Sequence, residues 1–428
     1  MDMVLYWAIH VPVQIERPLN VMIYSRCNGS TYMYRCTIIL CAFIFCISCS
    51  TTKPLKSIYK DKNVTLSESE SKLWESSVSF EESLGKSKMK YTDAALENYL
   101  NRVLQNLIQD KEIINKYKPH VGIIKNPYLN AFALPNGGIY IHSGILARLD
   151  NEAQLAAVLG HELIHFLNRH AFRSLTKKIQ ESRQRVAVSI FFSIAMLPLP
   201  NVAEVIGSYW ELAAISGYSK NLEREADESA LVLMAQAGYD PREAIDVFKL
   251  MKKEYDEGKK PEPFYYGSHP LLDERIANVE TFLKDNKKTL ASMKMMKLKE
   301  IDYTRNISDL LLCNAEADLE INRFKTAEMA IQRHLALNPM SYRGHYCRGK
   351  LILQSNAGAK GTEQAIQSFK KSIQLNPSYP LSHRELGLIY YDRQQAQLAL
   401  YEFKQYLALA NNPVDGPIIR QYINALSK

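Results

Sequence analysis

The chain has 428 residues, which corresponds to about two or three domains of ordinary size. Hydrophobic residues make up 46% and charged residues 23%, so the composition excludes a mostly disordered chain, a collagen and a polytopic membrane protein. The formal net charge of +8 is a mild excess without a dense basic block, which argues against a nucleic-acid-binding protein.

Residues 1–48 are predicted to be a targeting segment. Residues 37–49 form an apolar run that is shorter than the roughly 20 residues of a membrane-spanning helix but suits the core of a signal peptide. The run ends in a Cys-Ile-Ser-Cys sequence that resembles a bacterial lipobox, so we expect translation to start at Met33 and Cys49 to carry a lipid. Because Ser50 follows the cysteine, the usual sorting pattern favours the outer membrane, on the periplasmic side of a bacterial envelope. The alternative for the run is a buried helix.

An α+β domain is predicted to follow over residues 91–300. Residues 49–90 are rich in Ser, Lys and Glu and are predicted to be a flexible tether. From Tyr91, leucines recur at helical spacing, and three short strands follow, the last two joined by an Asn-Gly-Gly turn. A long helix then begins near Asp150, so the pattern predicts a mostly helical domain with a small antiparallel sheet.

The C-terminal third repeats itself. Asn-Pro pairs recur at intervals of 38 and 36 residues, close to the period of about 34 residues of the tetratricopeptide repeat. Residues 301–428 are therefore predicted to form an all-α domain of about three such repeats, a scaffold that binds partner proteins. Cys313 and Cys347 fall at equivalent positions of successive repeats and are expected to be thiols rather than a disulfide.

The motif that carries chemistry is His-Glu-x-x-His at His161, Glu162 and His165. Positions i and i+4 share one face of a helix, so the two imidazoles can bind one zinc ion while Glu162 lies beside it to take a proton from water. The motif is short, and the alternative is an ordinary helix with two exposed histidines. Its flanks are apolar, however, which predicts a buried helix in which unpaired His and Glu side chains would be costly.

A third metal ligand is expected downstream, because zinc hydrolases with two histidines commonly add a glutamate. Glu223 and Asp227 lie four residues apart on a predicted helix, so one can bind the metal and the other can hydrogen-bond a ligand histidine. Glu225 is a rival ligand, but at two residues from Glu223 it cannot share that face. The alternative is a solvated charged face held by Glu–Arg pairs.

These motifs, in this order, resemble the HtpX/BepA-type zinc endopeptidases, which are relatives of the CAAX prenyl protease. The resemblance covers residues 91–285 and includes the strand pair at 130–140 ahead of the zinc helix. It implies a zincin-like metalloprotease fold and one zinc ion per chain. By this resemblance, the zinc ligands are His161, His165 and Glu223, the general base is Glu162, and Asp227 supports a ligand histidine.

Further expectations concern other histidines, an apolar stretch and the position of the substrate. His269, in a Ser-His-Pro segment that matches the family, is expected to approach the zinc and take an active-site role. His170 and His142 are expected to be structural. The apolar stretch 186–199 is short and broken by prolines, so it is expected to pack over the cleft as a lid rather than span a membrane. The substrate is expected to lie extended along residues 130–134.

The lipid-anchored, repeat-bearing arrangement is most similar to the BepA branch of this family, which works on outer-membrane protein assembly and quality control. The resemblance implies hydrolysis of internal peptide bonds in unfolded or misassembled envelope proteins. The repeats would dock substrate or a protein partner such as the outer-membrane assembly machinery. Two alternatives stay open: a chaperone or adaptor whose peptidase site is latched or weakly active, and a regulatory protease with one dedicated substrate.

Overall fold

The computed structural model describes residues 55–59, 61, 64–178, 218–256, 272–291, 299–355 and 358–427. The described residues from Leu55 onward belong to one compact unit. The predicted signal segment with Cys49, the apolar stretch 186–199 and His269 lie outside the described residues. Of the helices in the described part of the chain, none is both long and apolar enough to cross a membrane.

A four-stranded sheet lies at the centre of the N-terminal half, with the strand order β1-β2-β4-β3. Its strands are β1 (Lys90–Tyr91), β2 (His120–Ile124), β3 (Ala131–Ala133) and β4 (Gly138–His142). The prediction of an antiparallel sheet was wrong for the central pair, because β2 and β4 run parallel while the other neighbours are antiparallel. The loop after β2 carries the chain past the position of β4, so the β3–β4 hairpin places β4 beside β2 and leaves β3 at the edge of the sheet.

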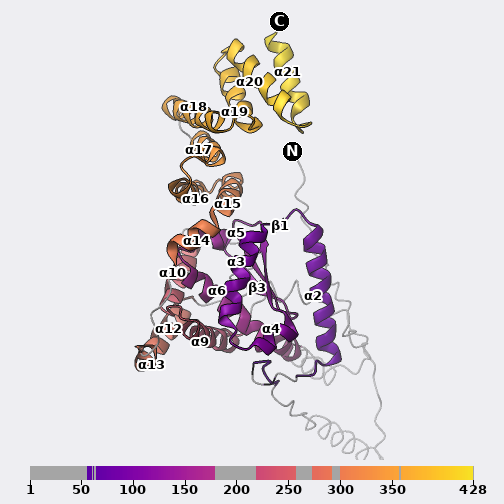
Figure 1. The fold of residues 1–428 in the computed structure, drawn as a ribbon, viewed down its shortest axis with the longest axis vertical. Coiled ribbons are helices and arrows are strands. Elements are labelled where there is room, and N and C mark those ends of the chain that lie inside the picture. The colour runs from indigo at the N-terminus through magenta and orange to yellow at the C-terminus, as the bar shows by residue number, and fades with distance from the viewer. Residues whose placement is uncertain are drawn as a thin grey trace, which may run out of the picture. The chain divides into compact units, whose positions relative to one another are not determined.

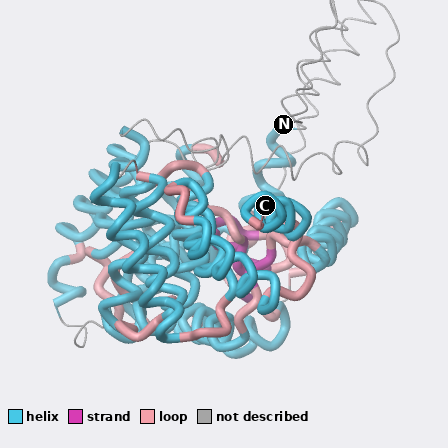
Figure 2. Tube along the Cα trace, turned by 90° about the horizontal axis from the view of Figure 1, so that it is seen from above, coloured by secondary structure: helices cyan, strands magenta, loops and turns pink. Residues whose placement is uncertain are grey.

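Helices surround this sheet and supply most of the domain, while the strands occupy a small area (Figure 2). The helices are α3 (Ala94–Leu107), α4 (Lys111–Tyr117), α5 (Ser143–Arg148), α6 (Glu152–Leu167), α9 (Lys220–Gln236), α10 (Glu243–Asp256), α12 (Leu272–Asp285) and α13 (Lys287–Ala291).

The helix that carries the His-Glu-x-x-His motif, α6, is the centre of the core. It begins where the side chain of Asn151 accepts a hydrogen bond from the backbone N–H of Gln154, and all of its residues are buried. Gly160 faces Ala230 of α9, and a Cβ added at Gly160 would lie 3.4 Å from the Cβ of Ala230, so α6 and α9 meet here through two small residues. This contact places the downstream acidic helix against the histidine-bearing face of α6.

The segment predicted to be a tether is a structured part of the domain from residue 55 onward. Residues Glu68–Lys86 form α2, which lies alongside the sheet (Figure 1), and Ile58 and Leu73 are buried. Glu81 on α2 accepts hydrogen bonds from the side chains of Asn136 and Tyr140. The composition hid this helix because its buried stripe includes two polar residues: Glu70, whose partner Arg169 is far away in the sequence, and Ser77, whose hydroxyl donates to the carbonyl of Leu73 within the helix.

The C-terminal region consists of helices, as predicted (Figure 1). They are α14 (Glu300–Asn306), α15 (Ser308–Glu320), α16 (Phe324–Leu337), α17 (Tyr342–Gln354), α18 (Gly358–Leu375), α19 (Pro380–Asp392), α20 (Ala396–Leu409) and α21 (Gly416–Leu426). They pack as the pairs α15–α16, α17–α18 and α19–α20. A Cβ added at Gly387 would lie 2.5 Å from the ring of Phe403, so the small residue is what allows the close packing of α19 and α20. Cys313 and Cys347 are free thiols, the first half-buried and the second buried.

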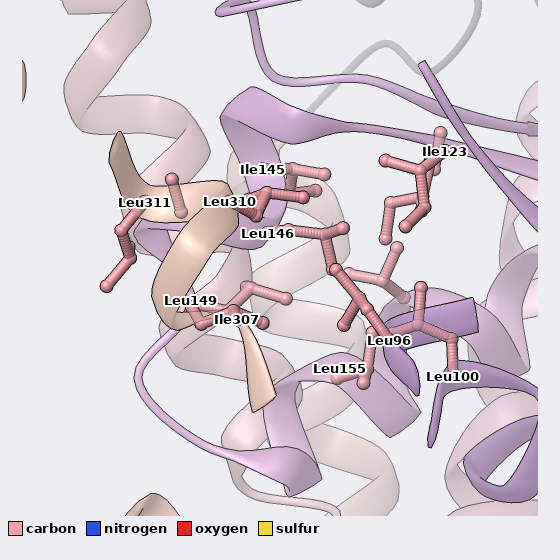
Figure 3. Packing of buried hydrophobic residues seen from close by; sticks show 14 of the residues in the cluster. Leu96, Leu100, Ile123, Ile145, Leu146, Leu149, Leu155, Ile307, Leu310 and Leu311 are labelled. Carbon is pink, nitrogen blue, oxygen red and sulfur yellow. The ribbon is translucent and has the colours of Figure 1, made fainter. Parts of the chain in front are cut away.

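The first repeat shares its core with the N-terminal domain. Ile307 and Leu310, at the start of α15, pack with Leu146 of α5 and with Leu96 and Leu155 of α3 and α6 (Figure 3). Nearby, Arg148 of α5 and Arg323 of the repeats both pair with Glu254 at the end of α10. The N-terminal domain and the first repeat are therefore joined by an interface that contains both hydrophobic contacts and ion pairs.

Candidate metal centre

The structure brings together the three side chains that the spacing and the family resemblance single out as ligands. His161 and His165 lie on one face of α6, with their Nε2 atoms 3.0 Å apart. The Glu223 carboxylate of α9 lies 3.5 Å from the Nε2 atom of His161 through one oxygen and 3.4 Å from that of His165 through the other. All three are buried, and within the described ranges they are the one group of three or more His, Cys, Asp or Glu side chains that could hold a metal ion.

This arrangement fits a small divalent cation. Metal–ligand bonds of about 2.0–2.1 Å at a tetrahedral angle separate the ligand atoms by about 3.3–3.4 Å, and the observed separations are 3.0, 3.4 and 3.5 Å. The local charge also favours a cation. Burial and the charge of Arg275 oppose protonation of His161, yet its contacts with Asp227 and Glu223 raise its pKa to about 9.

Asp227 orients His161. Its Oδ1 atom lies 2.8 Å from Nδ1 of His161, and Arg275 of α12 donates to both carboxylate oxygens at 2.7 and 2.8 Å. Burial opposes ionisation of Asp227, but Arg275 and His161 lower its pKa, so the carboxylate accepts the Nδ1 proton. The lone pair of Nε2 then faces the other two ligand atoms. Thus Glu223 faces the Nε2 atom of His161 and Asp227 faces its Nδ1 atom, an assignment that the spacing left open.

His170 contacts His165, the second histidine of the motif. Its Nδ1 atom lies 2.9 Å from Nδ1 of His165, and its Nε2 atom lies 3.5 Å from the Glu225 carboxylate. Tyr218 stacks on the ring of His165, with ring centroids 4.0 Å apart. When Nε2 of His165 faces the metal position, its Nδ1–H donates to His170, whose own N–H points to Glu225.

Glu225, the rival ligand, therefore lies beside His170 and not beside the Nε2 atoms of His161 and His165. Its carboxylate accepts hydrogen bonds at 2.9 Å from both Asn168 and Arg173. The hydrogen bond with His170 lowers the pKa of Glu225 to about 2. Burial opposes this effect, and Arg173 adds to it. Burial lowers the pKa of His142, another histidine expected to be structural, to about 4.

We expect His170→Phe, which keeps a ring but removes the acceptor, to weaken metal binding by about 10–100-fold. The physical reason is that His165 loses the partner that fixes its tautomer and ring orientation. Competition against a zinc-chelating dye measures this directly, without reference to activity. His345→Phe in α17 is the matched control, because it makes the same exchange far from the site. An affinity equal to that control would show that His170 does not position His165.

Arg275 was given no role from the sequence, and His170 was expected to be structural only. A signal for Arg275 was present, because it lies six residues after His269 in the segment that matches the family. The contact between His170 and Glu225 could not be read from the sequence, because it depends on the packing of α9 against the end of α6. Glu162 is buried, with 3% of its surface exposed, next to His161 on the same helix.

Comparison with known proteins agrees with this geometry. Residues 94–283 match the model of peptidase family M48, and residues 362–394 match a TPR repeat model. A putative beta-barrel assembly-enhancing protease of Vibrio cholerae is 28% identical over 192 residues, which cover 44% of this chain and 39% of that protein. The beta-barrel assembly-enhancing protease of Escherichia coli K12 is 29% identical over 192 residues, 44% of this chain and 38% of that protein.

A second group of relatives is mitochondrial. The mitochondrial metalloendopeptidase OMA1 of Schizosaccharomyces pombe is 32% identical over 189 residues, which cover 44% of this chain and 53% of that protein. The chain thus spans about half or less of the length of these relatives, over the region that holds the metal centre. Residues 94–283 are therefore similar to the metalloproteases of peptidase family M48, and residues 362–394 are similar to a tetratricopeptide repeat.

Proposed function

We propose that this protein is a zinc-dependent metalloendopeptidase that hydrolyses internal peptide bonds of unfolded or misassembled envelope proteins. The observation that carries the proposal is the buried triangle of His161, His165 and Glu223 beside Glu162, within a domain of family M48. Two imidazoles and one carboxylate are a ligand set of catalytic zinc sites, which keep the fourth position for water or substrate.

His161, His165 and Glu223 would hold the zinc ion. When bound there, zinc supplies Lewis acidity, which lowers the pKa of water and polarises the peptide carbonyl. Glu162 is the general base: it takes a proton from the attacking water and passes it to the leaving amine. Asp227 keeps Nε2 of His161 directed at the ligand position, and Arg275 fixes Asp227 by two hydrogen bonds.

His269 completes the proposed set on the strength of the family resemblance. Its imidazole would donate a hydrogen bond to the carbonyl oxygen of the scissile bond as negative charge develops there. The substrate would lie extended along β3, the edge strand that precedes the metal helix in the fold. Backbone hydrogen bonds to a strand edge bind many sequences, which suits a protease that acts on unfolded chains.

The envelope location is also a proposal. Its support is the similarity to bacterial proteins whose names refer to beta-barrel assembly, together with the lipobox-like sequence that ends at Cys49. We propose that a lipid on Cys49 anchors the protein to the outer membrane, facing the periplasm. The repeats would dock substrates or a component of the outer-membrane assembly machinery.

Removal of the metal tests the proposed activity. The purified protein is expected to contain one zinc ion per chain and to cleave β-casein, which is unfolded in its native state. Extraction of the zinc with a chelator is expected to reduce cleavage to background, and added zinc to restore it, because the base has no activated water without the metal. Stoichiometric zinc with no cleavage of casein or of unfolded outer-membrane proteins would contradict the peptidase and favour an adaptor with a latched site.

A further inference from the structure

Arg275 contacts three side chains of the metal centre at once. Besides its two hydrogen bonds to Asp227, its Nη2 atom lies 3.2 Å from Nδ1 of His161, and its Nη1 atom lies 3.5 Å from the Glu223 carboxylate. All four side chains are buried. A shift of the guanidinium group would therefore disturb two of the three proposed ligands, so the position of Arg275 must itself be fixed.

The ring of Phe248, on α10, supports this guanidinium group. The guanidinium carbon of Arg275 lies over the ring, 4.3 Å from its centroid, and the two residues are only 3% and 6% exposed. The attraction between a cation and an aromatic ring is strongest where water is excluded. A guanidinium directs its N–H donors outward in its own plane, and the ring uses none of them. Phe248 therefore holds Arg275 without competing with Asp227 for its hydrogen bonds.

The helix that carries Phe248 is attached to the rest of the fold at both ends. At its first residue, Glu243 accepts hydrogen bonds from the side chains of Asn151 and Gln154, at 2.8 and 3.0 Å, at the start of α6. Near its other end, Glu254 pairs with two arginines, one from α5 and one from the first repeat. The position of Phe248 is thus set by contacts to the start of the metal helix and to the repeats.

The alternative is that Phe248 only fills space between α10 and α12. Among the buried side chains that the structure describes on α10, Phe248 alone is aromatic, and it is the one over which Arg275 lies. A leucine or methionine would also exclude water there, but would offer the buried cation no electron-rich ring face. The two roles therefore predict different effects of aliphatic and aromatic replacements.

We propose that Phe248 is a positioning residue of the metal centre, which acts on His161 through Arg275 and Asp227. This inference rests on the proposed function, because it concerns the same zinc site, but it does not depend on the substrate. Partners of ligand residues contribute about 10–100-fold to metal affinity. Because Phe248 acts from one contact further away, we expect loss of its ring to weaken zinc binding by about 10-fold, at the low end of that range.

The test measures the zinc affinity of the full chain by competition with a zinc-chelating dye, without reference to cleavage. Phe248→Leu removes the ring and is expected to bind zinc about 10-fold more weakly than the wild type. Phe248→Tyr keeps the ring and is expected to retain the wild-type affinity. Phe369→Leu is the matched control, because it removes a fully buried ring from α18, in the repeats, and is expected to leave the affinity unchanged.

A double-mutant cycle tests whether the effect passes through Arg275. In an Arg275→Gln background, Phe248→Leu is expected to change the zinc affinity by less than about 2-fold, because the cation on which the ring acts is gone. A loss as large in this background as in the wild type would overturn the proposed route, since general packing would then account for it.

Thermal unfolding establishes that each variant is folded before its zinc affinity is compared. If either Phe248 variant fails to fold, Phe248→Met replaces the leucine variant and Phe248→Trp replaces the tyrosine variant. A zinc affinity of Phe248→Leu equal to that of the wild type would overturn the assignment, as would equal losses in the leucine and tyrosine variants. A wild-type protein that binds no zinc would contradict the proposed function itself, and the role of Phe248 with it.

Discussion

Replacing Glu162 with glutamine is expected to lower the rate of peptide hydrolysis by about 10²–10⁴-fold. Glutamine has nearly the same shape as glutamate but cannot accept a proton from water. Because Glu162 is only 3% exposed, bulk water has little access to replace the lost base. The three proposed ligands are unchanged, so the variant is expected to keep its zinc. The measurement is kcat/KM on a casein-derived peptide, together with the zinc content of the same preparation.

Glu228→Gln is a close control for this variant, because it makes the same change at an exposed position of the neighbouring helix α9. Normal hydrolysis in a zinc-loaded Glu162→Gln variant would contradict the assignment of Glu162 as the base. Loss of the zinc in this variant would contradict it in a different way, because it would place Glu162 in the ligand set. A folded, zinc-loaded variant with a rate near background supports the assignment.

The metal centre was predictable from sequence to the extent that its geometry is local. The spacing of His161 and His165 is enough to place both on one face of a helix, and the structure places them so. Glu223 and Asp227 satisfy the same rule between themselves, so helical spacing alone could not rank them. The assignment of the two carboxylates depends on how α9 packs on α6. This packing places Glu223 against Nε2 of His161 and Asp227 against Nδ1 of the same residue.

The sheet and the N-terminal helix were harder to predict because their partners are distant in sequence. The turn residues correctly predicted that β3 and β4 form a hairpin. The pairing of β2 with β4 rather than with β3 depends on the path of the loop after β2, which the sequence pattern did not predict. In α2 the buried stripe consists of Glu70, Leu73, Ser77 and Leu84. Because half of these residues are polar, the sequence pattern does not distinguish the helix from a solvent-exposed segment. Glu70 is stable inside the protein only because Arg169, 99 residues away in the sequence, meets it there.

Replacing Glu70 with glutamine is expected to destabilise the protein by about 3–5 kcal/mol. Arg169 directs Nε to one oxygen of Glu70 at 2.6 Å and Nη2 to the other, and both residues are at least nine-tenths buried. The variant leaves a buried guanidinium without its counter-ion, and a lost partner of a buried ion pair costs far more than a lost surface pair. Arg169 also has φ of 56°, an unfavourable conformation for this residue type that its contacts must maintain.

Urea unfolding of the zinc-free protein measures this loss without a contribution from metal binding. Glu68→Gln is the matched control on the same helix, because Glu68 pairs with Lys72 at an exposed position, and its replacement is expected to change the free energy of unfolding far less. Arg169 directly follows the end of α6 and also donates to the backbone carbonyl of Lys56. A large loss confined to Glu70→Gln would therefore mean that residues 55–86 are part of the peptidase fold and clamp the end of the metal helix. If Glu70→Gln and Glu68→Gln had equal effects on the free energy of unfolding, α2 would not be needed for the stability of the peptidase fold.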